Sequence, residues 1–102
     1  MQNKKLVNLA IQILPQGQDK AEAYRMVDAA IEAIAASGLK YVVCPFETVV
    51  EGTYAEVITV LESAQDSAFS AGAASLLVNM KLHRSAAGSE QIANKMEKYE
   101  AS

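Results

Sequence analysis

The sequence predicts one α+β domain in which a four-stranded antiparallel sheet carries two helices on one face. Stretches with alternating apolar and polar residues are interleaved with stretches whose apolar residues recur every three or four positions. These stretches follow one another as strand, helix, strand, strand, helix, strand, with a shorter amphipathic segment at the end. The 102 residues suffice for one two-layer core but not for two, so we expect residues 1–102 to form a single domain.

The first strand is predicted over residues 4–14, where apolar residues alternate with polar or small ones. One side of this strand presents Val7, Leu9, Ile11 and Ile13, and the other presents Asn8, Ala10 and Gln12. Pro15 and Gly17 then end the strand. We expect the apolar side to face the core.

The first helix is predicted to begin at Asp19, because Glu22 three residues later completes an N-terminal capping pattern. Its apolar stripe consists of Tyr24, Val27, Ile31 and Ile34. Ser37-Gly38 supplies the left-handed residue that commonly ends a helix. A short apolar strand is predicted next, over residues 39–43.

Residues 44–54 read CPFETVVEGTY and predict a hairpin followed by the start of a helix. Pro45 suits the second position of a turn, and residues 48–51 are typical of the returning strand. Gly52 ends this strand, and Thr53 with Glu56 repeats the capping pattern for a second helix. The tip of the hairpin, residues 46–48, is also a candidate rim for a binding site.

The second helix is predicted to bury a stripe formed by Val57, Leu61, Ala64 and Ala68, and to end at Ala71-Gly72. The last strand is predicted over residues 74–83. One side of it carries Leu76, Val78, Met80 and Leu82, and the other carries Leu77, Asn79, Lys81 and His83. In the C-terminal extension, residues 84–102, Ile92, Met96 and Tyr99 predict a short amphipathic helix. Two successive β-α-β halves of this kind predict a ferredoxin-like sandwich.

The face of the sheet away from the two helices, here called the open face, has a mixed character. It carries Asn8, Ala10, Gln12, Leu77, Asn79 and Lys81. Only the C-terminal helix is available to cover this face within one chain. We therefore expect the open face to be sheltered by self-association, by a ligand or by both.

Composition and charge exclude several classes of protein. The net charge is −3 and the basic residues are scattered, which argues against a nucleic-acid-binding protein. Cys44 is the only cysteine, so neither an internal disulfide nor a paired-cysteine metal site can form. No stretch is long and apolar enough to span a membrane, and no signal-peptide pattern opens the sequence. We expect a soluble cytoplasmic protein that does not act on a membrane.

The sequence contains few residues with recognisable catalytic patterns. It has no glycine-rich phosphate-binding motif and no nucleophile-elbow motif. His83, the only histidine, is expected to be a solvated ring at the end of a strand, and Cys44 a partly buried strand-end residue rather than a reactive thiol. Asn79 and Lys81 project from one face, where they either contact a ligand or line an interface. We expect no enzymatic activity.

Three stretches carry a resemblance to a known family: AIQILPQG at residues 10–17, ASGLKYVVCPFETVVEG at residues 36–52, and AGAASLLVNMKL at residues 71–82. In order and spacing they resemble the thiamine-binding protein family, long known as a domain of unknown function. The resemblance covers about residues 6–83, and the segment after Arg84 lies outside it. The family pattern includes Gln12, Pro15, Thr48, Glu51 and Lys81.

The resemblance implies a ferredoxin-like protomer that assembles through its sheet into a homodimer or homotetramer. It also implies binding of thiamine or its hydroxymethylpyrimidine moiety, without catalysis and without a cofactor. A regulatory or assembly module that oligomerises through its sheet and has no physiological small ligand is the alternative. An enzyme of the acylphosphatase type would need an arginine in the loop after the first strand, and residues 15–18 have none.

The chemistry of an aminopyrimidine suggests which residues would contact it. Phe46 or Tyr41 offers an aromatic surface for the ring, and a thiazolium cation would favour Glu47 or Glu51. Polar partners for the ring nitrogens and the amino group are available among Gln12, Glu47, Thr48 and Asn79. Gln12, Thr48 and Glu51 fall on family positions, whereas Phe46, Glu47 and Asn79 are proposed from chemistry alone.

Overall fold

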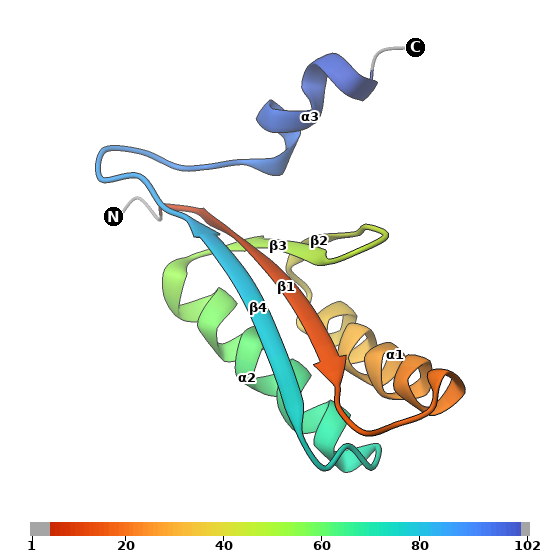
Figure 1. Cartoon of the computed structure of the whole chain (residues 1–102). Coiled ribbons are helices and arrows are strands. Elements are labelled where there is room, and N and C mark those ends of the chain that lie inside the picture. Colours follow the sequence, from red (N-terminus) through yellow and green to blue (C-terminus); the bar gives the residue numbers. More distant parts are fainter. Residues whose placement is uncertain (1–4, 101–102) are drawn as a thin grey trace.

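The computed structural model describes residues 5–100 and contains the predicted order of strands and helices, with a third helix at the end (Figure 1). The elements are β1 (Val7–Pro15), α1 (Lys20–Ala36), β2 (Lys40–Val43), β3 (Thr48–Gly52), α2 (Tyr54–Ser70), β4 (Leu76–His83) and α3 (Ile92–Glu100). Lys4, where the first strand was predicted to begin, and both ends of the predicted domain, residues 1–4 and 101–102, lie outside the described residues.

The four strands form one antiparallel sheet in the order β2-β3-β1-β4. Helices α1 and α2 pack side by side on one face of this sheet, as Figure 1 shows. The predicted α+β ferredoxin-like sandwich is therefore confirmed, with β1 and β3 in the middle of the sheet and β2 and β4 at its edges.

The capping residues set the helix boundaries as predicted. The Asp19 carboxylate accepts a hydrogen bond from the Glu22 backbone N–H at 2.9 Å. At the start of α2, Thr53 Oγ1 accepts from the Glu56 N–H at 3.3 Å and Glu56 Oε1 accepts from the Thr53 N–H at 2.8 Å, so both halves of the capping box form. Gly72 follows α2 with φ +116°, a backbone conformation that side-chain-bearing residues rarely adopt.

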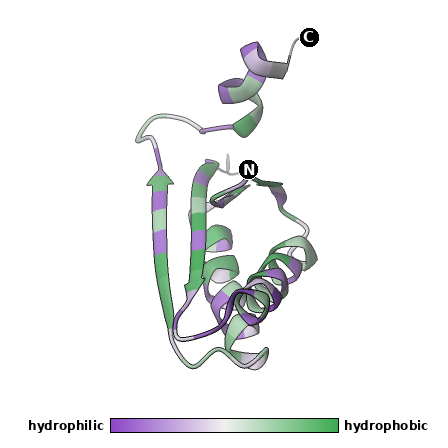
Figure 2. Cartoon of the chain, turned by 45° about the vertical axis from the view of Figure 1, so that its right-hand side comes forward, coloured by the Kyte–Doolittle hydropathy of each residue, from purple (hydrophilic) through white to green (hydrophobic). Residues whose placement is uncertain are grey.

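The core lies between the sheet and the two helices. The predicted inner side of β1 is buried, together with Val50 of β3 and the predicted stripe of α2. Figure 2 shows the alternation of hydrophobic and hydrophilic residues along the strands that produces this arrangement. Most of the hydrophobic stabilisation of the domain comes from this layer, because burial of apolar surface scales with the area removed from water.

The predicted stripe of α1 is partly wrong. Met26, Ala30 and Ile34 are the buried residues of this helix. Tyr24 is 61% exposed, and the Lys20 ammonium lies 5.7 Å from the centre of its ring. The stripe is displaced because α1 packs against both α2 and the sheet, so the centre of its contact lies between the two neighbours.

The strand register defines the open face. Ala10 lies opposite Lys81 and Gln12 lies opposite Asn79 in the β1–β4 pair. Opposed residues project from the same face, so the predicted members of the open face do share one side of the sheet. Met80 and Leu82 project from the helix side, yet they are 49% and 42% exposed because β4 is an edge strand with no described neighbour beyond it.

The C-terminal segment folds back over the end of the sheet. The Leu6 N–H donates to Ser89 Oγ at 2.9 Å, and the Glu90 N–H donates to the Leu6 carbonyl at 2.9 Å. These bonds bring α3 onto the open face, where the Ile92 side chain is buried. In the part of the chain that the structure describes, no helix has the length and apolar character needed to cross a membrane.

Candidate functional site

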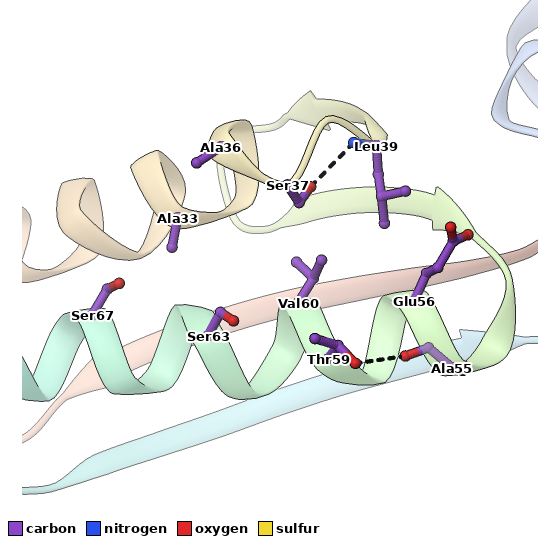
Figure 3. A pocket seen from close by; sticks show the side chains of 10 residues that line it. All are labelled: Ala33, Ala36, Ser37, Leu39, Ala55, Glu56, Thr59, Val60, Ser63 and Ser67. Atoms are coloured by element: carbon purple, nitrogen blue, oxygen red, sulfur yellow. Dashed lines mark hydrogen bonds between the residues drawn. The ribbon is translucent and has the colours of Figure 1, made fainter.

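A wide groove runs between α1 and α2, with a volume of about 660 Å³. Figure 3 shows that small side chains line it, among them Ala33 and Ala36 from α1 and Ser63 and Ser67 from α2. The Thr59 hydroxyl in its wall donates to the Ala55 carbonyl at 3.0 Å within the same helix. None of the residues predicted from chemistry lines this groove, so its size alone does not make it the candidate site.

Another hollow lies between the open face and α3, has a volume of about 310 Å³, and is here called the open-face pocket. Its lining comes from the sheet, the β2–β3 turn and α3. The lining residues are Asn8, Ala10, Val42, Cys44, Glu47, Val49, Lys81, Leu82, His83, Ile92, Lys95 and Met96. The interior is largely apolar and the charged groups stand at its rim, a combination typical of small-molecule sites.

Polar contacts hold α3 over this pocket. The Ile92 N–H, at the first position of the helix, donates to Glu51 Oε1 at 2.7 Å. Lys95 Nζ donates to Asn8 Oδ1 at 2.7 Å, while Asn8 Nδ2 donates to the Glu90 carbonyl at 3.1 Å. Asn8 is buried, and the hydrogen bonds to both ends of its side-chain amide offset the free-energy cost of burying it.

Charged side chains of both signs meet at the pocket rim. Lys81 Nζ lies 3.4 Å from Glu47 Oε1. On the other side, His83 Nδ1 lies 3.5 Å from Glu90 Oε1, and Ser85 Oγ donates to the other oxygen of Glu90. The hydrogen bond from Ser85, with smaller contributions from His83 and Lys95, lowers the pKa of Glu90 below its ordinary value.

An amide pair lies on the open face, next along the strands from the pocket. Asn79 Nδ2 donates to Gln12 Oε1 at 3.1 Å across β1 and β4. Asn79 is two residues from Lys81 on the same strand face, which brings the pair next to the rim cation. Each side-chain amide can form further hydrogen bonds, so the pair offers both donors and acceptors.

The structure brings four of the six predicted site residues together on one side of the sheet. Glu47 lines the pocket. Gln12 and Asn79 are not among the lining residues, but each lies two positions along its strand from one of them, Ala10 and Lys81. Glu51 lies on the same face, opposite Asn8, but its carboxylate accepts the hydrogen bond from the start of α3. In this structure Glu51 therefore positions the helix that closes the pocket.

The other two predicted site residues lie elsewhere. Thr48 is opposite Ile11, on the helix side of the sheet, and is buried there. Thr48 and Glu51 are an odd number of residues apart, so their side chains project from opposite faces of β3. Phe46 is at the tip of the β2–β3 turn, which the Cys44 N–H closes with a 2.8 Å bond to the Glu47 carbonyl, and it is 80% exposed.

The contribution of the C-terminal segment to the site was not predicted from the sequence. Ile92, Lys95 and Met96 all line the pocket, and Asn8 anchors the helix that carries them. The sequence offered two signals for this contribution: the amphipathic spacing of Ile92 and Met96, and the amide of Asn8 on the open face. Neither signal indicated which part of the sheet the helix would cover.

The groups around the open-face pocket are suited to binding a small molecule. Within residues 5–100, no group of three or more His, Cys, Asp or Glu residues lies close enough to hold a metal ion. His83 and Ser85 both contact Glu90 and form no pair with each other among the hydrogen bonds described for these residues. An apolar floor with a carboxylate, an ammonium and amides at the rim can hold a small, flat, polar-edged molecule.

Comparison with known proteins decides the family. The family model described as thiamine-binding protein matches residues 9–100. The chain belongs to the thiamine-binding protein family. The predicted resemblance is thus confirmed, but its limit at residue 83 was wrong, because the match continues through α3. The helix that closes the open-face pocket is part of the family's domain.

Relatives of this thiamine-binding family member agree in sequence and in fold. A UPF0045 protein of Clostridium perfringens is 32% identical over 75 residues, which cover 74% of this chain and 78% of the relative. A domain of unknown function from Bacillus cereus has a TM-score of 0.88 at 31% identity and covers 95% of this chain and 92% of its own. A Thermotoga maritima protein, provisionally named for thiamine biosynthesis or salvage, has a TM-score of 0.83 at 26% identity, with coverages of 92% and 98%.

Proposed function

We propose that this protein binds thiamine or its hydroxymethylpyrimidine moiety in the open-face pocket, without catalysis, as a cytoplasmic homodimer or homotetramer. The observation that carries the proposal is an apolar pocket with a mixed-charge rim in a member of the thiamine-binding protein family. The Thermotoga maritima relative named for thiamine biosynthesis or salvage supports the same class of ligand.

The pocket chemistry suits an aminopyrimidine. Ala10, Val42 and Val49 provide an apolar floor against which a flat ring can lie, and Met96 provides an adaptable wall. The Glu47 carboxylate accepts a hydrogen bond from the exocyclic amino group. The Gln12–Asn79 amide pair supplies donors and acceptors for the ring nitrogens.

The rim also suits the positive charge of a thiazolium ring. Glu47 provides a partly exposed carboxylate close to the pocket mouth. Its present partner, Lys81, is largely exposed, so the ion pair is weak and the ammonium can turn toward water when a cationic ligand arrives. Phe46 lies next to Glu47 in the chain and can cover the outer part of the ligand from the turn. Thr48 takes no part in the proposed site, because it faces the core.

An assembly module without a small ligand is the second candidate function. It is favoured by apolar side chains that remain exposed outside the pocket, notably Leu77 on the open face and Met80 at the sheet edge. Under this hypothesis the pocket would be vestigial and self-association would be the whole function.

Isothermal titration with thiamine and with hydroxymethylpyrimidine separates the two functions. We expect saturable heat with one ligand per chain for at least one of the two compounds. A variant with Val49→Trp would fill the pocket from its floor and should abolish the heat, whereas Ala33→Trp, in the groove between α1 and α2, should leave it unchanged. No heat at millimolar ligand with a folded wild-type protein would contradict the binding function and leave the assembly module.

A further inference from the structure

The open-face pocket carries positive charge in a chain that is acidic overall. The whole sequence has 9 Lys and Arg residues against 12 Asp and Glu residues, with a net charge of −3. Among the residues that line the pocket this balance is reversed, with Lys81, Lys95 and His83 against one carboxylate, that of Glu47. Cations gathered at one hollow attract anions to it. Thiamine is a cation and hydroxymethylpyrimidine is neutral, so neither would make use of this charge.

The strand register separates the charged groups of the pocket into two ends. At one end, Lys81 Nζ and Glu47 Oε1 form an ion pair at 3.4 Å. His83 is two residues, or about 7 Å, further along β4 and lies opposite Asn8 of β1. Lys95 Nζ donates to Asn8 Oδ1 at 2.7 Å, so Lys95 and His83 lie together at the end of the sheet that α3 covers (Figure 1). These two residues are here called the basic end of the pocket.

The basic end has hydrogen-bonding capacity in reserve. The Lys95 ammonium has three donors and gives one to the neutral amide of Asn8. Within residues 5–100, no ion pair joins Lys95 to a carboxylate. His83 Nδ1 faces Glu90 Oε1 at 3.5 Å, which leaves Nε2 on the other side of the ring for another partner.

The two carboxylates nearest to the basic end are bound to other groups. Glu90 accepts a hydrogen bond from the Ser85 hydroxyl, and Glu51 Oε1 accepts one from the Ile92 N–H at 2.7 Å. Neither carboxylate lines the pocket. An anion that enters the pocket would therefore reach Lys95 without displacing a carboxylate from it.

We propose that the open-face pocket takes the phosphate monoester of hydroxymethylpyrimidine in preference to the free alcohol, with the phosphate between Lys95 and His83 and the amino group at Glu47. This inference rests on the proposed function, because it names the form of the ligand that the same site holds. A phosphate monoester carries between one and two negative charges near pH 7 and offers three strong acceptor oxygens. Lysine binds phosphate as a point charge. Each end of the ester thus meets the end of the pocket with the complementary charge.

Isothermal titration at low salt tests the preference with three compounds: hydroxymethylpyrimidine, its phosphate monoester and inorganic phosphate. We expect the ester to bind about tenfold more tightly than the alcohol, and added salt to reduce this ratio, because salt screens partly exposed charges. Inorganic phosphate should bind more weakly than the ester, since it has no ring to cover the apolar floor of the pocket.

A lysine substitution assigns the preference to the basic end. Lys95→Gln removes the cation and keeps a donor that can contact Asn8, so the affinity ratio of ester to alcohol should fall to about twofold. Lys20→Gln, at the exposed start of α1, removes the same charge elsewhere and should keep the wild-type ratio. A general loosening of α3 would weaken both compounds alike and leave the ratio unchanged. If circular dichroism shows that Lys95→Gln is unfolded, His83→Gln should lower the ratio in its place.

Four results would contradict the inference. A wild type that binds the alcohol as tightly as the ester would overturn the phosphate preference and leave the proposed function intact. An unchanged ratio in folded Lys95→Gln would contradict the role of the basic end. Inorganic phosphate that binds as tightly as the ester would mean that the pocket holds any phosphate. No heat with either pyrimidine would contradict the proposed function itself, and this inference with it.

Discussion

Glu47 has two neighbours that define its role, the pocket that it lines and the Lys81 ammonium at 3.4 Å. We expect Glu47→Gln to weaken binding of thiamine about fivefold, because a partly exposed charged hydrogen bond contributes roughly 1 kcal/mol. Isothermal titration measures this change. Glu32→Gln, an exposed carboxylate on α1, is the matched control and should bind as the wild type does. Equal affinity for both variants would remove Glu47 from the site.

Thr48 illustrates how the structure changes a prediction at a single residue. Its side chain is buried on the helix side of β3. Thr48→Val should leave ligand affinity unchanged and alter the free energy of unfolding by no more than about 1 kcal/mol, since only a hydroxyl is exchanged for a methyl group. Chemical denaturation and titration of the same variant measure the two quantities. A loss of affinity in a normally stable Thr48→Val protein would contradict this placement.

Sequence reasoning could place some of these side chains and not others. The period of two along a strand separates Thr48 from Glu51, so their different faces followed from the sequence once β3 was recognised. The hydrogen bond between Glu51 and Ile92 joins residues 41 positions apart and has no local signal. Long-range contacts of this kind depend on how the C-terminal segment packs, which no short-range pattern specifies.

The strength with which α3 is held over the pocket depends on Glu51. Its carboxylate occupies the place of a capping group at the start of the helix. We expect Glu51→Ala to destabilise the docked helix by about 1 kcal/mol, so hydrogen exchange of the α3 amides should become roughly fivefold faster, with exchange in the core unchanged. Glu62→Ala, on the exposed side of α2, is the control, and unaltered exchange in Glu51→Ala would show that α3 is held by other contacts.

Low pH should also loosen the C-terminal segment, because it protonates Glu90. Because the pKa of Glu90 in the folded chain is lowered, its ionised form stabilises the folded segment above the ordinary value of 4.5. That contribution is lost as the pH falls through the lowered pKa. We expect amide exchange in residues 85–92 to rise below pH 4.5 before the core responds, and Glu90→Gln to remove this pH dependence. An identical acid response in Glu90→Gln would assign the effect to another group.

Elements with strong local signals were predicted well. Capping residues, the Pro45 turn and the α2 stripe all depend on neighbours in sequence, and the structure has them as expected. The α1 stripe was misplaced because two neighbouring layers share that helix, and Tyr24 was assigned to the wrong side of it. The apolar periodicity of a helix shows which of its sides is apolar but not which surface that side packs against. The location of α3 on the open face could therefore not be predicted from the sequence.

On the scale of the whole molecule, the open face divides into two regions. The C-terminal segment covers Asn8 and Ala10 and closes the pocket, while Leu77 and Asn79 stay exposed nearer the other end of β4. The expectation that this face needs a cover is thus met in part within one chain.

The location of the ligand is tested most directly by mapping backbone amide shifts in a ¹⁵N-labelled sample during titration with hydroxymethylpyrimidine. We expect the largest changes at Ala10, Val42, Val49 and Met96, which surround the open-face pocket. Changes centred on Ala33, Ser63 and Ser67 would place the ligand in the groove between α1 and α2 and contradict the proposed site.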